Sequence, residues 1–252
     1  MQIKDKVVVI TGAGKGIGRA MAQAFAARGA QLALLDLNET DLAQSRSLCE
    51  SAGVRVANYR CNVANETEVV ATFEQIAKDF GRLDVLVNNA GILRDAMLVK
   101  QDRGVTKKMS LEQWQAVMDV NLTGVFLCGR EAAERMIKFD NGGVIINMSS
   151  VSRSGNIGQS NYAAAKAGVA SLTVVWAKEL ARHGIRTGAI APGFVLTEIL
   201  SSMRPEILER VLMQVPMRRG GQPEEVAQAA LFIVENEYFS GRVIELDGGL
   251  RL

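Results

Sequence analysis

Short apolar runs alternate with longer amphipathic stretches along the whole chain. Runs rich in β-branched and other apolar residues predict seven strands, at residues 6–11, 31–36, 54–60, 83–87, 143–148, 185–190 and 241–246. The run KVVVIT at 6–11 is apolar at nearly every position, which is typical of a strand buried on both faces of a parallel sheet. Apolar residues at helical spacing between the strands predict intervening helices. We therefore expect an α/β fold with a seven-stranded parallel sheet and helices on both faces.

Polar capping residues mark the ends of the expected helices. Either Asn38 or Thr40 can cap a helix that runs to about residue 52, and SLEQ at 110–113 matches a capping box that begins a helix to about 137. Further helices are expected at 66–80, 158–182 and 223–234. We interpret residues 92–110 as an irregular charged loop, too polar for the core. No linker or repeat divides the chain, so we expect residues 1–252 to form a single doubly wound domain.

Composition and charge exclude several classes of protein. With 252 residues, 48% of them hydrophobic and only 4 prolines, the chain can bury a substantial core. A net charge of +2, with the basic residues dispersed, does not suggest binding to nucleic acid or to a membrane surface. We interpret the basic pairs at 107–108 and 218–219 as solvated loop charges.

The cysteines do not suggest a disulfide framework or a metal site. Cys49, Cys61 and Cys128 are widely spaced, and the chain has one histidine, His183. No apolar run approaches the roughly 18 residues that a membrane span needs, and no signal peptide precedes the first strand. We therefore expect a cytoplasmic protein with reduced thiols and no metal.

A glycine-rich turn follows the first predicted strand and precedes a helix. It contains Gly12, Gly14, Gly16 and Gly18. Backbone without side chains lets a pyrophosphate approach closely, and free amides at the start of a helix donate to it. This is the context of a dinucleotide site in a Rossmann fold, although the spacing Gly-x-x-x-Gly-x-Gly departs from the usual Gly-x-Gly-x-x-Gly. A tight turn without a ligand is the alternative.

Asp36, at the end of the second predicted strand, bears on the choice of cofactor. A carboxylate at this point can accept hydrogen bonds from both ribose hydroxyls of an adenosine and would repel a 2′-phosphate. It therefore favours NAD over NADP. Lys15 argues mildly for a 2′-phosphate, so NADP stays open, and a role for Asp36 as a helix cap is the alternative.

Tyr162 and Lys166 lie four residues apart at the start of an alanine-rich helical stretch. Residues at this spacing share one face of a helix, so the phenol and the ammonium should lie side by side. A nearby cation favours the phenolate and is expected to lower the pKa of the phenol, which suits proton transfer at neutral pH. Taken alone, such a pair is more often a solvated helix face.

Six short motifs then occur in a fixed order along the chain. They are TGAGKGIG at 11–18, NNAG at 88–91, Asn121, a serine at the end of the fifth strand, YxxxK at 162–166 and PGFVLT at 192–197. In these motifs the whole chain resembles the short-chain dehydrogenase/reductase family, and it is most similar to the branch of 3-oxoacyl-acyl-carrier-protein reductases. The resemblance implies an NAD(P)-dependent enzyme that transfers a hydride between nicotinamide and a carbonyl or secondary alcohol.

The resemblance also implies roles for individual residues. Tyr162 would exchange a proton with the substrate oxygen, Lys166 would lower the pKa of Tyr162 and bind the nicotinamide ribose, and Asn121 would hold a water that connects Lys166 to solvent. The residues expected to bind the cofactor are Gly12, Gly14, Lys15, Gly16, Ile17, Gly18, Asp36, Asn62, Val63, Asn89, Ala90, Gly91, Tyr162, Lys166, Pro192, Gly193, Val195 and Thr197. Among these, 62–63 would flank the adenine, 89–91 the adenosine ribose, and Thr197 the nicotinamide carboxamide.

Two adjacent serines compete for the role of orienting the substrate oxygen. Counting forward from the fifth strand gives Ser150, and counting back from Tyr162 by the family's common thirteen residues gives Ser149. Strand register fixes where side chains point, whereas loops absorb deletions. We therefore favour Ser150 and keep Ser149 as the alternative.

The substrate is less well defined than the family. A segment at about 194–217 corresponds to the family's lid and is rich in apolar residues: Phe194, Ile199, Leu200, Met203, Leu208, Leu212 and Met213. These would suit an acyl chain, but a helix packed on its own protein explains them equally well. The resemblance implies a 3-oxoacyl thioester on a carrier protein or CoA as the substrate. The alternatives are an NAD-dependent dehydrogenase of 3-hydroxyacyl groups or other secondary alcohols and, more remotely, a non-catalytic dinucleotide-binding sensor. The resemblance to the family also implies a homotetramer, built through the helices at 111–137 and 158–182 and through the last strand.

Overall fold

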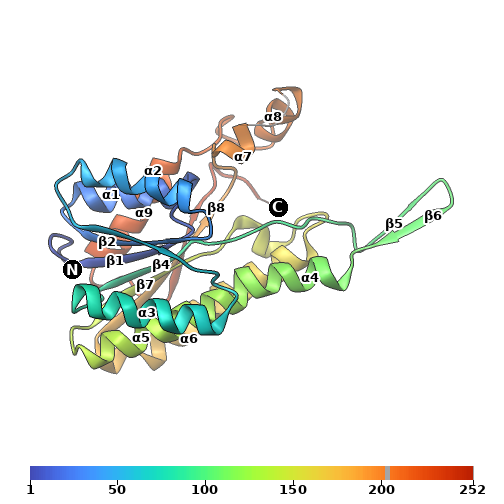
Figure 1. Ribbon diagram of the computed structural model, residues 1–252. Helices are drawn as coiled ribbons and strands as arrows, with labels where there is room; N and C mark the ends of the chain where they lie inside the picture. The colour runs from blue at the N-terminus through green and yellow to red at the C-terminus, as the bar shows by residue number, and fades with distance from the viewer. Residues whose placement is uncertain (202–204, 252) are drawn as a thin grey trace.

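A parallel sheet of seven strands forms the centre of the computed structural model, which describes residues 1–201 and 205–251 (Figure 1). Its strands are β1 (Val7–Thr11), β2 (Gln31–Asp36), β3 (Val56–Arg60), β4 (Val85–Asn88), β7 (Gly143–Met148), β8 (Ile185–Pro192) and β9 (Arg242–Leu246). They lie in the order β3-β2-β1-β4-β7-β8-β9. Five of the seven predicted strands differ from these bounds by one or two residues at an end, and the predicted α/β Rossmann class is confirmed.

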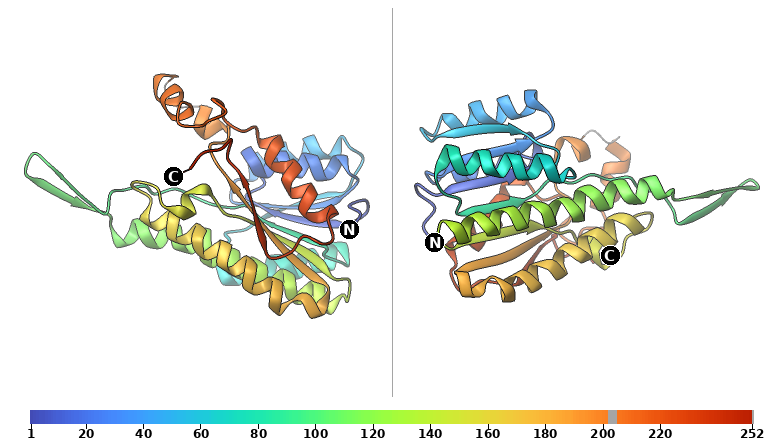
Figure 2. Two further views of the ribbon diagram at one scale, coloured as in Figure 1. Left: turned by 180° about the vertical axis from the view of Figure 1, so that it is seen from behind. Right: turned by 60° about the horizontal axis from the view of Figure 1, so that its bottom comes forward.

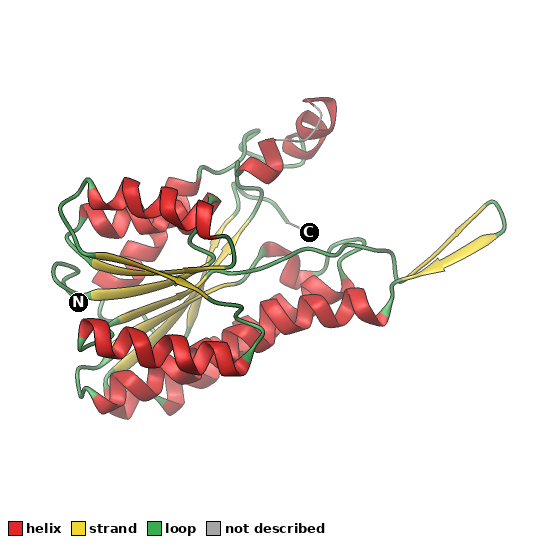
Figure 3. Ribbon diagram, viewed as in Figure 1, coloured by secondary structure: helices red, strands yellow, loops and turns green. Residues whose placement is uncertain are grey.

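Helices cover both faces of the sheet (Figures 2 and 3). On one face lie α1 (Gly16–Ala27), α2 (Glu39–Glu50) and α9 (Pro223–Glu235); on the other lie α3 (Glu66–Phe80), α5 (Gly124–Lys138) and α6 (Ser160–Glu179). Alternate strand residues enter the two cores, as Val8 and Ile10 pack toward the first group of helices and Val9 toward the second. Burial on both faces explains why the strands are apolar at nearly every position.

The direction in which the chain adds strands to the sheet reverses at β1. The chain leaves β1 toward β2 on one side, and β4 lies on the other side of β1. In open α/β sheets, ligands bind beyond the carboxyl ends of the strands at such a reversal. The glycine-rich turn after β1 and the NNAG segment after β4 both lie at this point.

The helix boundaries follow the capping residues closely. Of the two candidate caps for α2, Asn38 is the one used, since its side chain accepts from the amides of Thr40 and Asp41. Ser110 and Gln113 form the predicted capping box at the start of α4 (Leu111–Met118). The prediction of one continuous helix to residue 137 is wrong in one respect, because a π-helical turn, Asp119–Thr123, separates α4 from α5.

The stretch 92–110 is not wholly irregular, which corrects the sequence-based prediction. Strands β5 (Val99–Asp102) and β6 (Val105–Lys108) form an antiparallel hairpin that projects from the body (Figures 1 and 2). Arg103 and Gly104 both have positive φ, of 48° and 79°, which matches the two-residue turn that such hairpins prefer. The strands that flank this turn are mostly polar, so the sequence carries no apolar alternation that would predict a hairpin. Lys107 and Lys108 are therefore strand residues, although exposed as expected.

The segment after β8 contains two short helices, α7 (Glu198–Ser201) and α8 (Pro205–Leu212). Leu200 is buried, and Met213 is largely exposed; Met203 lies outside the described residues. Cys49, Cys61 and Cys128 are buried and unpaired. Within the described ranges, no helix is both long enough and apolar enough to cross a membrane.

Candidate active site

The glycine-rich turn packs so tightly that side chains would not fit at two of its positions. A Cβ on Gly18 would lie 2.0 Å from the carbonyl oxygen of Gly12, and a Cβ on Gly12 would lie 2.9 Å from the Cα of Ala90. Gly12 also has a φ of +63°, which disfavours any other residue. Glycine at these positions therefore brings the first turn of α1 against β1 and against the segment after β4.

The start of α1 offers unused amide donors. Its N-cap residue, Lys15, makes no side-chain capping bond, and its first turn has no acidic residue. Amides left free at a helix start, together with the helix dipole, bind phosphate groups. This arrangement, with Gly16 and Ile17 opening the helix, fits the pyrophosphate of a dinucleotide.

Asp36 lies at the end of β2, beside the glycine-rich turn. One carboxylate oxygen accepts from the amide of Gly14 at 2.9 Å, and the other accepts from the amide of Asn38 at 3.1 Å. Each oxygen keeps acceptor capacity for a ligand hydroxyl. The side chain is only half-buried, so the carboxylate remains accessible next to the turn.

Arg19 and Ser45 support the same turn, and the sequence analysis did not identify them. The Arg19 guanidinium donates to the carbonyl of Gly14 and, at 3.0 Å, to the hydroxyl of Ser45. Ser45 in turn donates to the carbonyls of Ala13 and Gly14. Only the fold brings α2 to this turn, so no local sequence signal could have revealed the contact.

Asn89 connects the end of β4 to the end of β1. Its side-chain amide donates to the carbonyls of Thr11 and Gly12, both at 3.0 Å, and its main-chain amide donates to the hydroxyl oxygen of Thr11 at 3.0 Å. The Asn89 side chain therefore fixes the glycine-rich turn, and Ala90 packs against Gly12.

Asn62 and Val63 lie directly beyond β3. The Asn62 side-chain oxygen accepts from the amide of Ala64 at 3.1 Å and has a second lone pair to offer. Val63 is buried against Gly124, where a Cβ would lie 2.9 Å from a Val63 methyl group. Both residues are thus at the carboxyl edge of the sheet, as an adenine site requires.

The two serines after β7 have different partners. The Ser149 hydroxyl donates to the main-chain carbonyl of Lys166 at 2.8 Å. The Ser150 hydroxyl accepts from the amide of Ser152 at 3.1 Å, and it lies near enough to Tyr162 to lower the pKa of the phenol. Of the two serines, Ser150 is therefore the one that acts on the phenol.

The pKa of Tyr162 lies above its ordinary value. Burial raises the pKa because it disfavours the phenolate; the hydrogen bond from Ser150 lowers it, and the negative charge of Asp95 raises it further. The expectation that Lys166 lowers the pKa of this phenol is therefore wrong here. The ammonium nitrogen lies 5.6 Å from the centre of the Tyr162 ring, and burial is the largest influence on the pKa of the phenol.

Lys166 is itself deeply buried. Its ammonium donates to the main-chain carbonyl of Met148 at 2.6 Å, at the end of β7. Burial lowers the pKa of Lys166 from 10.5 to about 8, because the charged form loses its hydration. A lysine with this pKa exchanges protons readily near neutral pH.

Asn121 is completely buried in the π-helical turn and is bound to the segment after β4. Its side-chain oxygen accepts from the main-chain amide of Ile92, and its side-chain nitrogen donates to the main-chain carbonyl of Ile92, each at 2.8 Å. A Cβ on Gly91 would lie 2.9 Å from the Asn121 side-chain oxygen and 3.8 Å from the Lys166 nitrogen. Gly91 therefore lets Asn121 and Lys166 approach one another. π-Helical turns in helices are frequent at functional sites.

Asn161 is a buried residue of the site that the sequence analysis missed. Its side chain donates to the carbonyls of Arg94 and Gln113, both at 3.0 Å, and accepts from the amide of Tyr162 at 2.8 Å. It thereby fixes the first turn of α6 against α4 and against the loop after β4. A polar residue next to the tyrosine was the only sequence signal for it.

The PGFVLT segment turns back toward the glycine-rich turn. Pro192 ends β8, and a Cβ on Gly193 would lie 2.9 Å from the Cα of Asp247. Val195 is buried, and the Thr197 methyl group would lie 3.3 Å from a Cβ on Gly16. The fold therefore brings Thr197 to the start of α1.

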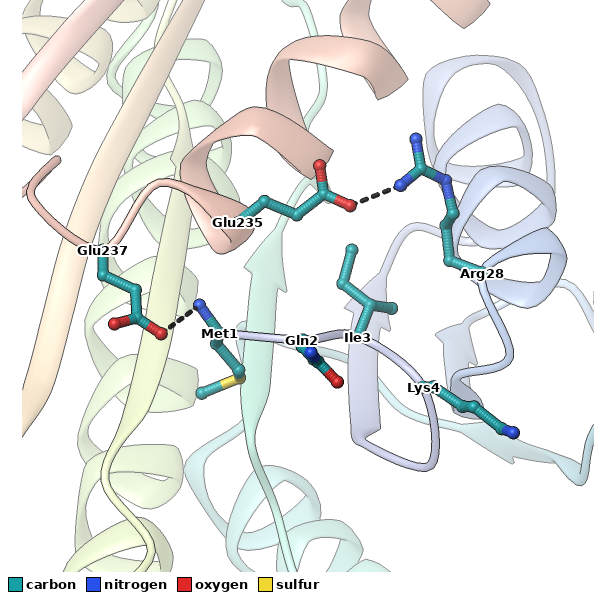
Figure 4. A pocket seen from close by; sticks show the side chains of 7 residues that line it. All are labelled: Met1, Gln2, Ile3, Lys4, Arg28, Glu235 and Glu237. Atoms are coloured by element: carbon teal, nitrogen blue, oxygen red, sulfur yellow. Dashed lines mark hydrogen bonds and ion pairs between the residues drawn. The ribbon is translucent and has the colours of Figure 1, made fainter.

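A surface pocket at the other end of the sheet is unrelated to this site (Figure 4). It is lined by the residues before β1 and by those around the end of α9: Met1, Gln2, Ile3, Lys4, Arg28, Glu235 and Glu237. The N-terminal ammonium pairs with Glu237 at 2.8 Å, and Arg28 pairs with Glu235. The first ion pair fastens the chain terminus, and the second joins the end of α1 to the end of α9.

Comparison with known proteins agrees with this geometry. Residues 12–251 match the family model described as enoyl-(acyl carrier protein) reductase. The chain is 42% identical to 3-oxoacyl-(acyl-carrier-protein) reductase FabG of Thermotoga maritima, over 99% of each chain. It is 41% identical to the 3-oxoacyl-(acyl-carrier-protein) reductase of Synechocystis, over 97% of this chain and 96% of the relative.

A solved structure gives the same result for the fold. The crystal structure of levodione reductase matches with a TM-score of 0.88 at 33% identity, over 98% of this chain and 97% of that one. Together, the family model, the relatives and the residues gathered around Tyr162 identify the chain as a member of the short-chain dehydrogenase/reductase family, the NAD(P)-dependent oxidoreductases.

Proposed function

We propose that the protein reduces a 3-oxoacyl thioester to the 3-hydroxyacyl thioester, with NADH as the hydride donor. The observation that carries this proposal is that Ser150, beyond the carboxyl end of β7, lies close enough to Tyr162 to lower the pKa of its phenol. Two neighbouring hydroxyl groups can both donate to one substrate oxygen. The names of the Thermotoga and Synechocystis relatives supply the substrate class.

In this mechanism the nicotinamide supplies the hydride and the chain supplies donors and a proton. The Ser150 oxygen accepts from the amide of Ser152, so the hydroxyl can donate its own proton to the carbonyl oxygen of a bound substrate. Tyr162 donates its proton to the oxygen as negative charge develops there. Its raised pKa keeps it protonated at neutral pH, which suits the reductive direction.

Lys166 and Asn121 support the proton transfer. With a pKa of about 8, Lys166 can return a proton toward the phenol near neutral pH. Asn121 holds the segment after β4 and a π-helical turn beside Lys166, and we propose that this turn holds the water that connects Lys166 to solvent.

Asp36 supports the preference for NADH. Its carboxylate lies next to the glycine-rich turn, held by the amides of Gly14 and Asn38. A 2′-phosphate at this position would meet a negative charge, whereas ribose hydroxyls would find an acceptor. Lys15, at the N-cap of α1, provides a weaker counter-argument.

We also propose a homotetramer, with segment 194–217 acting as a lid within the single domain. Val174 and Val175 on α6 and Phe126 on α5 are exposed apolar residues on the two long helices. Together they would suit helix pairing between subunits. A sedimentation measurement that gives a stable monomer would contradict this assembly.

Initial rates with NADH and NADPH test the proposal directly. The panel should contain 3-oxoacyl, 3-hydroxyacyl and 2-enoyl thioesters of several chain lengths, since the family model is described by an enoyl substrate. We expect the highest kcat/KM for 3-oxoacyl thioesters with NADH. Preferred oxidation of 3-hydroxyacyl groups would favour the dehydrogenase alternative, and turnover of enoyl thioesters alone would refute the substrate.

Tyr162→Phe separates an enzyme from a dinucleotide-binding sensor. We expect this variant to retain NADH binding and to lose nearly all turnover, because the phenyl ring keeps the packing without the proton. Unchanged turnover in this variant would overturn the assigned mechanism.

A further inference from the structure

The hairpin β5–β6 and its flanking residues form an arm, residues 98–109, whose strand side chains are not buried against any other part of the described chain. All eight strand side chains are exposed, including Val99 and Val105. An isolated two-stranded hairpin is marginally stable in water and needs a further surface to pack against. The arm is therefore a candidate for contact with another molecule.

Charge is concentrated in this arm. It carries four basic residues, Lys100, Arg103, Lys107 and Lys108, and one acidic residue, Asp102, whereas the whole chain has a net charge of only +2. Lys100 and Lys107 lie directly opposite one another across the two strands. Like charges at such positions repel. None of the four basic side chains forms an ion pair with the part of the chain that the structure describes.

The base of the arm is bonded to the segment that holds Tyr162. The amide of Ala96 donates to the carbonyl of Gly158 at 2.9 Å, and Gln159 donates to the carboxylate of Asp95 at 2.9 Å. Asn161 holds the carbonyl of Arg94 in the same way. The arm thus projects from the end of the molecule at which the catalytic residues lie (Figure 1).

We propose that this arm docks the acidic surface of the protein that carries the acyl thioester. The proposal rests on the proposed function, which supplies a thioester substrate. A cationic arm next to the site would attract an acidic carrier and raise its local concentration. Contact with the carrier would also remove the unfavourable repulsion between Lys100 and Lys107. A small thioester without a carrier would make no use of the arm.

The test compares the same 3-oxoacyl group attached to a carrier protein and to a small thiol. The variant Lys100→Gln/Lys107→Gln removes two cations and the repulsion between them, so the fold should be retained. The control Lys4→Gln/Lys78→Gln removes the same charge from exposed positions elsewhere. Each protein is assayed with a 3-oxoacyl group on an acyl carrier protein and on N-acetylcysteamine, which is small and uncharged.

We expect the arm variant to raise KM for the carrier-bound substrate roughly five- to tenfold, with kcat unchanged, because exposed charges act mainly on association. Its KM should also depend less on salt. The N-acetylcysteamine substrate and the control variant should behave as wild type. Equal effects on both substrates, or none on either, would overturn the proposal.

Two further measurements distinguish carrier docking from the alternative explanations. Sedimentation that shows a smaller oligomer for the arm variant would mean that the arm joins copies of this chain, which refutes docking. Fluorescence anisotropy with a labelled carrier protein measures docking without turnover. If the wild type reduces neither thioester, the proposed function fails, and weaker carrier binding by the arm variant would still support the docking surface.

Discussion

The hydroxyl group of Ser149 donates a hydrogen bond to the main-chain carbonyl of Lys166, 2.8 Å away. This bond occupies Ser149 with the backbone of α6 and leaves the neighbouring serine to Tyr162. The two adjacent serines thus have different roles. Ser149 holds α6 against β7, and Ser150 acts at the reacting oxygen.

Alanine at each serine should therefore give different defects. Ser150→Ala removes a donor to the substrate oxygen and is expected to lower kcat by roughly 10²–10³-fold with little change in stability. Ser149→Ala should cost about 1 kcal/mol of unfolding free energy and change kcat far less. Steady-state rates and urea unfolding of both variants check this. A larger kcat loss for Ser149→Ala would reverse the assignment.

The pH dependence of Tyr162 should move in opposite directions in two variants. The negative charge of Asp95 raises the pKa of the phenol and the Ser150 hydrogen bond lowers it. Oxidation of a 3-hydroxyacyl substrate needs the phenolate and so gains rate as pH rises through this pKa. Asp95→Asn should shift that profile to lower pH, and Ser150→Ala should shift the residual profile to higher pH.

The Asp95 variant is a conservative one. The asparagine side-chain oxygen can still accept from Gln159, so the loop contact is preserved. An unshifted profile in Asp95→Asn, with activity retained, would show that this carboxylate does not act on the phenol.

The sequence predicts most of the fold because the buried strands carry a strong local pattern. Strands β2 and β7 and helix α3 have the predicted bounds, since alternation of apolar runs, caps and glycines acts within a few residues. The hairpin β5–β6 was missed because a strand that buries nothing has no apolar pattern. The local sequence gives no signal for the π-helical turn at Asn121, whose side chain bonds to the distant Ile92.

The candidate site shows the same division. Motifs with fixed spacing identified Tyr162, Lys166 and the glycines. The supporting residues Arg19 and Asn161 could not be predicted, because their partners lie elsewhere in the sequence, at Ser45 and at Arg94 and Gln113. The direction of the Tyr162 pKa shift also depends on burial, which spacing does not reveal.

Burial of the Lys166 ammonium should lower the free energy of unfolding at neutral pH. Its pKa is lowered from 10.5 to about 8, so the folded state binds this proton less tightly than the unfolded state. The cost is fully present below pH 8 and disappears as pH rises toward 10.5. Lys166→Met should therefore have a free energy of unfolding about 1–2 kcal/mol higher at pH 7, even after loss of the bond to Met148. The variant should also lose activity.

The difference between wild type and Lys166→Met isolates this titration from all others. The stability advantage of the variant should shrink between pH 8 and 10.5 and be absent or reversed above that range. Paired urea unfolding curves at pH 7, 9 and 10.5 measure it. A constant difference across the three values would mean that the pKa of Lys166 is not lowered in the folded protein.

Asp36 should control the choice between the two nicotinamide cofactors. Asp36→Asn removes the negative charge but keeps an oxygen that can accept from Gly14. We expect kcat/KM with NADPH to rise and kcat/KM with NADH to fall, so that their ratio changes by roughly 10–100-fold, as loss of one repulsive charge near a phosphate allows. Asp41→Asn is a stringent control, because Asp41 lies beside the same turn: a Cβ built on Gly14 would be 2.8 Å from the Asp41 Cβ. Unlike the Asp36 carboxylate, the Asp41 carboxylate accepts no hydrogen bond from the turn in the described part of the chain. If both variants shift the ratio equally, the general negative field of α2 sets the preference, and the carboxylate at the end of β2 has no special part in it.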